Sequence, residues 1–134
     1  KLRELFLECD EDAHFDMIIT CPHRNRDNCS CRKPNPGMLS IGSKLLRTKP
    51  TQNFDSKQSI IEVDEKYETV NWWKEKISPE NELDLMIGDR SSDMGAGWAI
   101  GARLFQVPQS IGIKHVHKRI IDNSDKGDFF NPIR

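Results

Sequence analysis

The residues best suited to chemistry are gathered in the first quarter of the chain. Cys21, His23, Cys29 and Cys31 fall within eleven residues and bring three thiols and one imidazole into one short loop. Thiolate sulfur and imidazole nitrogen are ligands that zinc prefers, and four such ligands fill its tetrahedron without leaving a position for water. The spacing predicts a structural zinc ion that stiffens a polar loop. The alternative is a reactive or incidental cysteine cluster.

Disulfides are a less suitable interpretation of the same cysteines. One residue separates Cys29 from Cys31, and a disulfide between such close neighbours would be strained. Cysteine clusters in a reducing cytoplasm more often bind metal. The fourth cysteine, Cys9, lies apart and is interpreted as a small apolar residue near the end of the first helix.

A basic pair, Arg32 and Lys33, directly follows the last of these cysteines. A guanidinium and an ammonium side by side can neutralise a phosphoryl group and the charge that develops on it during a reaction. An arginine–lysine pair is usually solvated surface. This pair stands between the predicted metal loop and the turn-forming run 34–37, and that position favours a phosphate-binding role.

Two carboxylates, Asp89 and Asp93, stand four residues apart where a predicted strand passes into a helix. Magnesium favours oxygen ligands and usually takes one or two carboxylates together with waters and phosphate oxygens. Asp89 is the better magnesium ligand because it follows the tip of the strand, whereas Asp93 could cap or orient the loop. A simple Gly-Asp turn is the alternative for this segment.

The apolar pattern predicts the elements that position these groups. Residues 83–87 predict a strand, a helix capped by Ser91 or Ser92 follows to about residue 100, and residues 102–107 predict a further strand. This order is typical of an α/β domain with a parallel sheet, in which ligands collect at the carboxyl ends of strands. Elsewhere we expect a helix at 2–9, a buried strand at 15–20, a helix at about 38–46, a polar loop at 47–59, a charged helix at 62–77 and a mobile tail at 122–128.

Length and charge limit the classes of function. A chain of 134 residues suits one domain with a modest core. Its 20 basic and 21 acidic residues give a net charge of −1, so the overall charge gives no reason to expect nucleic acid or a membrane as a partner. The sequence lacks a signal-peptide pattern and an apolar run of roughly 18 residues. We expect a cytoplasmic protein and leave its oligomeric state open.

Taken together, these segments resemble the zinc-containing phosphatases of the haloacid dehalogenase superfamily. The resemblance is nearest to the group that hydrolyses D-glycero-D-manno-heptose 1,7-bisphosphate at the 7-position, and the histidinol-phosphate phosphatases are near relatives. The resemblance spans residues 15 to 107. Its motifs are Cys21-Pro22-His23, Cys29-Ser30-Cys31-Arg32-Lys33-Pro34-Asn35-Pro36-Gly37-Met38-Leu39, and Ile87-Gly88-Asp89-Arg90-Ser91-Ser92-Asp93-Met94 with Ala96-Gly97.

The resemblance implies a Rossmann-like fold with a parallel sheet and a role for each motif. Lys33 would be the catalytic lysine that binds phosphate, and Arg32 and Arg90 would contact the substrate, a phosphorylated small molecule. Asp89 would bind Mg²⁺. The ligands of a structural zinc would be Cys21, His23, Cys29 and Cys31.

The nucleophile of such enzymes is not convincingly present. They work through an aspartyl-phosphate formed on an Asp-x-Asp-Gly segment at the end of the first strand. The sequence offers only Asp10-Glu11-Asp12, followed by Ala13-His14, and a solvated acidic turn is the better interpretation. Residues 1–134 are therefore expected to be the carboxyl-terminal portion of one phosphatase domain, without its first strand and nucleophile, with a zinc loop at 21–33 and an insertion at about 47–75.

The expected function is hydrolysis of a sugar-phosphate monoester, in the first place a heptose bisphosphate at the 7-position. Histidinol phosphate is the alternative substrate, because the gap of five residues between His23 and Cys29 is as short as in that group. A second alternative is a non-catalytic, zinc-stabilised module, because the chain offers Lys33 and Asp89 without a convincing nucleophile.

Overall fold

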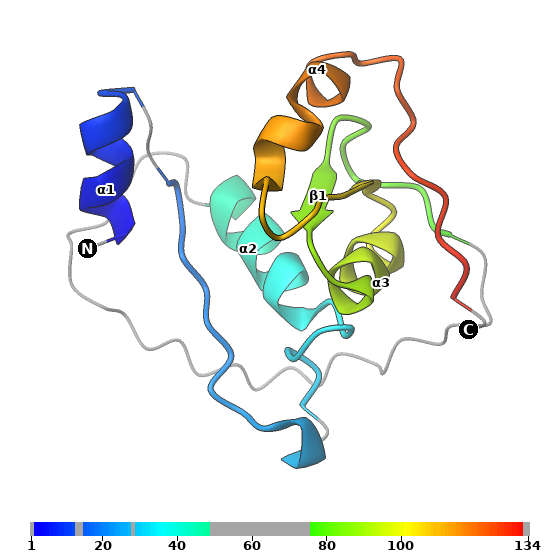
Figure 1. Ribbon diagram of the computed structural model, residues 1–134. Coiled ribbons are helices and arrows are strands. Elements are labelled where there is room, and N and C mark those ends of the chain that lie inside the picture. Colours follow the sequence, from blue (N-terminus) through cyan, green and yellow to red (C-terminus); the bar gives the residue numbers. More distant parts are fainter. Residues whose placement is uncertain (1, 13–14, 28, 49–75, 133–134) are drawn as a thin grey trace.

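Figure 1 shows the fold in a computed structural model, which describes residues 2–12, 15–27, 29–48 and 76–132. In this part of the chain the helices are short and the sheet is small, and the first helix lies apart from the sheet. In chain order the elements are α1 (Leu2–Cys9), the 3-10 helix η1 (Asn25–Asp27), α2 (Gly37–Thr48), β1 (Leu85–Gly88), α3 (Ser91–Ala99), β2 (Arg103–Gln106), the 3-10 helix η2 (Gly112–His115) and α4 (His117–Ile120).

A β-α-β unit forms the centre of the described structure. β1 and β2 pair in parallel, with Leu85 opposite Arg103 and Gly88 opposite Gln106. Two strands that run the same way must be joined by a crossover, and α3 provides it. The α/β class is confirmed in this two-stranded parallel sheet, and the two predicted strands are found with ends shifted by one or two residues.

A glycine lets α3 lie close against the sheet. A Cβ on Gly97 would overlap Met86 Cβ and stand 2.7 Å from Leu104 Cδ2, so the strands leave no room for a side chain there. Met94 and Trp98 of the same helix are buried together with Leu104. This apolar burial is the main force that holds α3 on the sheet.

The other face of the sheet is covered by the chain around η2 and α4. Phe105, Val107 and Val116 are buried there, and Leu85 and Ile87 pack against them. Successive side chains of a strand point to opposite faces, so alternate residues of β1 and β2 supply the two clusters. The short strands are thus packed on both faces.

The chain after α4 is tied to β2, so the prediction of a mobile tail at 122–128 is wrong. Asp128 Oδ2 accepts the Gln106 N–H at 2.8 Å, and the Asp128 N–H donates to the Leu104 carbonyl at 2.6 Å. Arg119 forms ion pairs with Asp125 and Asp128. The polar composition suggested exposure, but these polar groups find partners at the edge of the sheet.

Residues 15–20 do not form the buried strand that their apolar run predicts. Phe15, Ile18 and Ile19 are 39%, 64% and 37% exposed, and the segment has no strand partner among the described residues. A strand is stable only where a neighbour satisfies its backbone N–H and C=O groups. In the described sheet, β1 pairs with β2 alone, and residues 15–20 run beside α2 without joining either strand (Figure 1).

Two helix predictions in the first half of the chain are confirmed by α1 and α2. α2 continues to Thr48, into the start of the predicted loop at 47–59. The rest of that loop and nearly all of the predicted helix at 62–77 lie outside the described residues. No helix in the described ranges has the length and apolar character needed to cross a bilayer.

The helix after β1 is confirmed, but its predicted cap is wrong. The N-cap of α3 is Arg90, and Ser91 is already the first helical residue. Asp93 Oδ2 accepts the Arg90 N–H at 3.1 Å and so closes the first turn from within the helix. A carboxylate in the first turn satisfies an otherwise unpaired N–H and suits the positive end of the helix dipole.

Candidate metal centre and adjoining cleft

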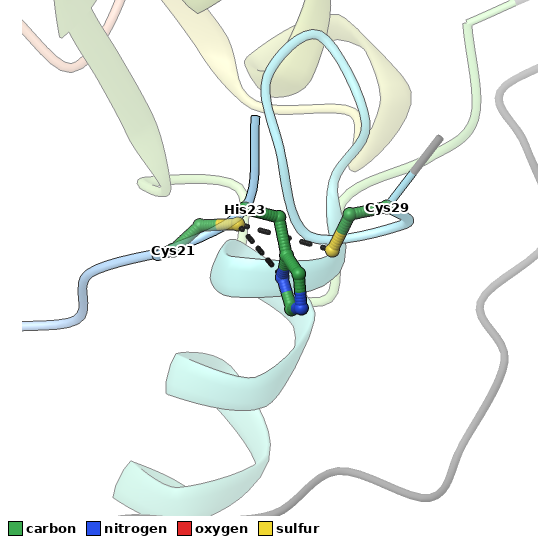
Figure 2. Close-up of side chains that lie close together, drawn as sticks. All are labelled: Cys21, His23 and Cys29. Carbon is green, nitrogen blue, oxygen red and sulfur yellow. Dashed lines mark hydrogen bonds between the residues drawn. The ribbon is translucent and has the colours of Figure 1, made fainter. Parts of the chain in front are cut away.

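Three of the four residues predicted to bind zinc bring their donor atoms together. The Sγ atoms of Cys21 and Cys29 lie 3.8 Å apart, and His23 Nδ1 lies 3.6 Å from Cys21 Sγ (Figure 2). All three donor atoms lie within 4.8 Å of one another. Cys21 and His23 precede η1 and Cys29 follows it, so the loop turns back on itself through this 3-10 helix.

The spacing of these atoms fits a metal ion such as zinc. A tetrahedral zinc with Zn–S bonds of about 2.3 Å and Zn–N bonds of about 2.0–2.1 Å separates two sulfurs by about 3.8 Å and a sulfur from a nitrogen by about 3.5 Å. The separations of 3.8 Å and 3.6 Å in the loop match these edges. The cluster can therefore hold such an ion with little movement of its donor atoms.

Hydrogen bonds within the loop support this arrangement. The Arg24 N–H donates to Asp27 Oδ2 at 2.7 Å and closes the turn around η1. Arg32 Nη1 donates to the His23 carbonyl at 2.8 Å, so the guanidinium is fastened to the backbone of a candidate ligand. The metal loop and Arg32 are thus one structural unit.

Cys31 is not part of the group of donor atoms, and its place as a fourth ligand stays a prediction. Its backbone N–H donates to Cys29 Sγ at 3.3 Å. Its own Sγ lies against the start of α2, where a Cβ on Gly37 would stand 2.9 Å from it. The Gly37 N–H also donates to the Ser30 carbonyl at 3.1 Å, so the loop closes on the helix at a residue without a side chain.

The three thiols differ in how readily they ionise. The hydrogen bond from the Cys31 N–H lowers the pKa of Cys29, because it stabilises the thiolate. Burial raises the pKa of Cys21 and the pKa of Cys31, because it disfavours the charged form. Since the thiolate is the form that binds metal, Cys29 is the sulfur best prepared to do so.

A cleft of about 490 Å³ opens beside the metal group. The structure brings together at this cleft Arg32, Lys33, Asp89 and Arg90, which come from the two predicted sites. Cys21 also lies on its wall, so the metal group and the cleft adjoin. The remaining lining residues are Ile19, Thr20, Met38, Ser92 and Gln109.

Lys33 and Asp93 meet beside the cleft. Asp93 is 3% exposed, and its Oδ1 forms an ion pair with the Lys33 ammonium. A Cβ on Gly88 would overlap the Asp93 side chain, so the end of β1 makes room for this carboxylate. The predicted orienting role of Asp93 agrees with these contacts, whereas Asp89 is exposed and lines the cleft.

The cleft carries an excess of positive charge. Lys33 is balanced by Asp93, which leaves the guanidiniums of Arg32 and Arg90 beside the single carboxylate of Asp89 on the described walls. An anion such as phosphate suits such a surface, because two cations outweigh one carboxylate.

The acidic run at 10–12 does not line the cleft. Its three residues are exposed, and the Asp12 N–H donates to Asp10 Oδ1 at 2.9 Å in a local turn after α1. The interpretation of this run as a solvated acidic turn is confirmed. Among the described residues, Asp89 is the one carboxylate on the cleft wall.

Three polar cleft residues were missed by the sequence analysis: Thr20, Ser92 and Gln109. Thr20 directly precedes Cys21, and Ser92 lies within the motif at 87–94, so the rule that ligands gather beside strand ends could have found both. Gln109 follows Pro108 in a loop without a recognisable pattern. It reaches the cleft because the end of β2 lies beside the end of β1. This pairing is a property of the fold and cannot be seen in the local sequence.

Curated proteins share short stretches with this chain. D-glycero-beta-D-manno-heptose-1,7-bisphosphate 7-phosphatase of Pseudomonas aeruginosa is 49% identical over 39 residues, which are 29% of this chain and 21% of that protein. The Haemophilus influenzae protein of the same name is 37% identical over 51 residues, 34% of this chain and 28% of that protein. Histidine biosynthesis bifunctional protein HisB of Baumannia cicadellinicola is 38% identical over 42 residues, 29% of this chain and 12% of that protein.

These similarities span less than a third of each of the three relatives. No family model matches the chain, and no solved structure matches it. The comparisons thus show a local similarity. Two of the three proteins are named as phosphatases.

Proposed function

We propose that these residues form part of a Mg²⁺-dependent phosphatase of the haloacid dehalogenase superfamily that hydrolyses a sugar-phosphate monoester. The observation that carries the proposal is the cleft, where Asp89 lies together with Arg32 and Lys33 although it is far from them in the sequence. The two short matches to proteins named as phosphatases support the reaction class.

In this proposal, the basic side chains bind the phosphoryl group. Lys33 and Arg32 would neutralise its charge, which grows in the transition state. The ion pair with Asp93 holds the Lys33 side chain, and the hydrogen bond to the His23 carbonyl holds that of Arg32, before the substrate arrives. The two side chains therefore lose less conformational freedom when the substrate binds. Arg90 would contact another part of the substrate.

The two metals have separate tasks in the proposal. Asp89 would hold Mg²⁺, which supplies Lewis-acid polarisation of a phosphoryl oxygen. Zinc would be structural, and it would fix the backbone that carries Arg32. Its ligands would be Cys21, His23 and Cys29, with Cys31 as the predicted fourth.

The attacking aspartate is proposed to lie upstream of these residues, on a strand that joins the sheet beside β1. The carbonyls of Asp84 and Gly88 accept hydrogen bonds from the chain of β2. Alternate backbone groups of a strand point to opposite sides, so those of Leu85 and Ile87 face away from β2. This edge is where a further strand would pair.

A groove beside that edge supports the same proposal. It has a volume of about 580 Å³ and touches both Leu85 and Met86, whose side chains point to opposite faces, so it runs along the edge of β1. Lys33 lines both the groove and the cleft. A strand seated in the groove parallel to β1 would therefore end at the basic side chains.

The first choice of substrate is D-glycero-D-manno-heptose 1,7-bisphosphate, hydrolysed at the 7-position. The names of the two phosphatase relatives support it, and the excess of positive charge in the cleft suits a substrate with two phosphates. Histidinol phosphate is the alternative and carries an ammonium group, which this charge suits less well. A non-catalytic, zinc-stabilised module is the rival from another class, favoured by the absence of a second carboxylate on the described cleft wall.

The test is phosphate release by the full-length protein with Mg²⁺, offered the heptose bisphosphate and histidinol phosphate in parallel. We expect turnover of the heptose substrate, and a fall of about a hundredfold or more in Asp89→Asn, which removes charge from the magnesium site. Release from histidinol phosphate alone would replace the substrate. Release from neither would overturn the enzyme proposal in favour of the module.

A further inference from the structure

The sulfurs of the metal group also form a candidate redox site. We propose that Cys21 and Cys29 form a reversible disulfide when a hydroperoxide oxidises the loop, and that this pair forms in preference to Cys29–Cys31. The inference rests on the positions of the thiols and is independent of the phosphatase reaction.

The geometry favours the first pair. The Sγ atoms of Cys21 and Cys29 lie 3.8 Å apart, and a disulfide bond is about 2.05 Å long, so the sulfurs need to approach by less than about 2 Å. Of the residues between them, the structure describes 22–27, which are exposed and include the single turn of η1. The loop therefore has room to make this small movement. Both cysteines are only partly buried, which leaves them accessible to a small oxidant.

The position of Cys31 disfavours the second pair. Its Sγ is held against Gly37 at the start of α2, and its backbone N–H is engaged by Cys29 Sγ at 3.3 Å. One residue separates it from Cys29, and a disulfide at that spacing would be strained. Closing Cys29–Cys31 would have to move the Cys31 sulfur away from the start of α2.

The oxidation proceeds in two balanced steps. A thiolate of the pair attacks the hydroperoxide, the O–O bond breaks, and a sulfenic acid and an alcohol are formed, or water when the oxidant is hydrogen peroxide. The second thiol then attacks the sulfenic sulfur, the S–S bond forms and water leaves. Two sulfurs are oxidised by two electrons in total, and the peroxide bond is reduced. A dithiol reverses the reaction by exchange.

The product differs from the reduced loop in its ability to hold metal. Thiolates are metal ligands and disulfide sulfurs are poor ones. The disulfide would remove two of the three donor atoms that lie together, and His23 alone would remain of the group. Oxidation would thus release a metal bound at this site and loosen the backbone that carries Arg32.

The first experiment treats the reduced, metal-free chain with one equivalent of hydrogen peroxide, blocks the remaining thiols and maps the disulfides by mass spectrometry. We expect Cys21–Cys29 in about tenfold excess or more over any other pairing, because its sulfurs are adjacent and the competing pair Cys29–Cys31 would be strained. Cys31→Ser should keep this disulfide, while Cys21→Ser and Cys29→Ser lose it. A dominant Cys29–Cys31 pairing, or direct conversion of the thiols to sulfinic acid, would overturn the proposal.

The same reaction in concentrated urea controls for folding. There the preference should fall and pairings with Cys9 should appear, since the chain no longer holds the sulfurs together. The same pairing ratios in urea and in buffer would contradict a role for the fold. A third arm uses chain loaded with zinc and follows release of the ion with a chromogenic chelator. Release should accompany Cys21–Cys29 formation and reverse with dithiothreitol, and release without that disulfide would also overturn the proposal.

Discussion

Lys33 and Asp93 form an ion pair that joins the segment after the metal loop to the first turn of α3. The side chain of Asp93 is 4% exposed, and that of Lys33 is 42% exposed. A buried carboxylate needs a partner, since water cannot solvate it. Lys33 therefore stabilises the fold at the same position where it presents its ammonium to the cleft, and the two motifs form one unit.

Substitutions of the two partners are expected to have unequal effects on stability. Lys33→Gln leaves a buried carboxylate without its cation and should lower the free energy of unfolding by about 1–3 kcal/mol. Asp93→Asn leaves a half-exposed ammonium that water can solvate, and keeps an oxygen for the Arg90 N–H, so it should cost less. Urea unfolding followed by circular dichroism measures both. If Asp93→Asn lowers the free energy of unfolding as much as Lys33→Gln does, the unequal burial of the two side chains does not govern their effects.

Zinc is expected at about one ion per chain, because the donor atoms already have the separations of a tetrahedral site. Elemental analysis of protein purified without chelators measures it. Cys29→Ser should lose the ion, and the matched variant Cys9→Ser should keep it. Removal of the ion with a chelator should speed hydrogen exchange in residues 15–27 and 29–36. A metal-free chain with unchanged exchange would show that the loop needs no ion.

Local patterns predicted the parts of this fold that have local causes. The β-α-β unit was found because Leu85, Ile87 and Phe105 supply one face of the two strands and the strands pair with each other. The metal group was found because its ligands lie within a few residues of one another, so little of the fold is needed to gather them.

The predictions that failed concern features that depend on residues far apart in the sequence. Residues 15–20 have a strand's composition, but a strand requires a neighbour, and the local sequence does not supply one. The tail was predicted to be mobile because it is polar, yet Asp128 reaches the edge of β2 and Arg119. The pairing of Lys33 with Asp93 could not be predicted either, since the two residues meet only when α3 is packed on the sheet.

Two glycines in helices are expected to respond oppositely to alanine. Gly97→Ala would press a methyl group against Met86 and Leu104 and should destabilise the fold by about 1–3 kcal/mol. Gly42→Ala in α2 would meet only the flexible end of Ile19, and alanine favours a helix over glycine by up to about 1 kcal/mol. Gly42→Ala should therefore be neutral or stabilising in thermal unfolding. A neutral Gly97→Ala would show that α3 does not lie as close to the sheet as described.

The anchoring of the tail is expected to depend on pH. The hydrogen bond and charge of Arg119 hold the pKa of Asp125 below its ordinary value. A carboxylate with a lower pKa in the folded state stabilises the fold above the unfolded pKa of about 3.9, and this stabilisation disappears as the pH falls through the folded pKa. The free energy of unfolding should therefore be higher for the wild type than for Arg119→Met at pH 6. This difference should shrink below about pH 4.

Lys126→Met is the matched control for that experiment, since Lys126 is exposed and has no ion pair in the described part of the chain. It should follow the wild type across the pH range. The guanidinium carbon of Arg119 lies 5.0 Å from the centre of the Phe105 ring. A difference in the free energy of unfolding between wild type and Arg119→Met that stays constant down to pH 2.5 would assign the effect to this packing rather than to the ion pair.

Residues 1–134 by themselves are expected to release no phosphate from either proposed substrate, although they should bind phosphate. Lys33, Arg32 and Asp89 lie at the cleft, but among the described residues the wall offers no second carboxylate that could attack phosphorus. Inorganic phosphate should protect the chain against thermal unfolding, and Arg32→Met should weaken that protection. Turnover by this chain that disappears in Asp10→Asn would place the nucleophile in the turn after α1 and contradict the proposal of an upstream strand. Turnover that persists in Asp10→Asn and is lost in Asp89→Asn would instead require a mechanism without an aspartyl-phosphate.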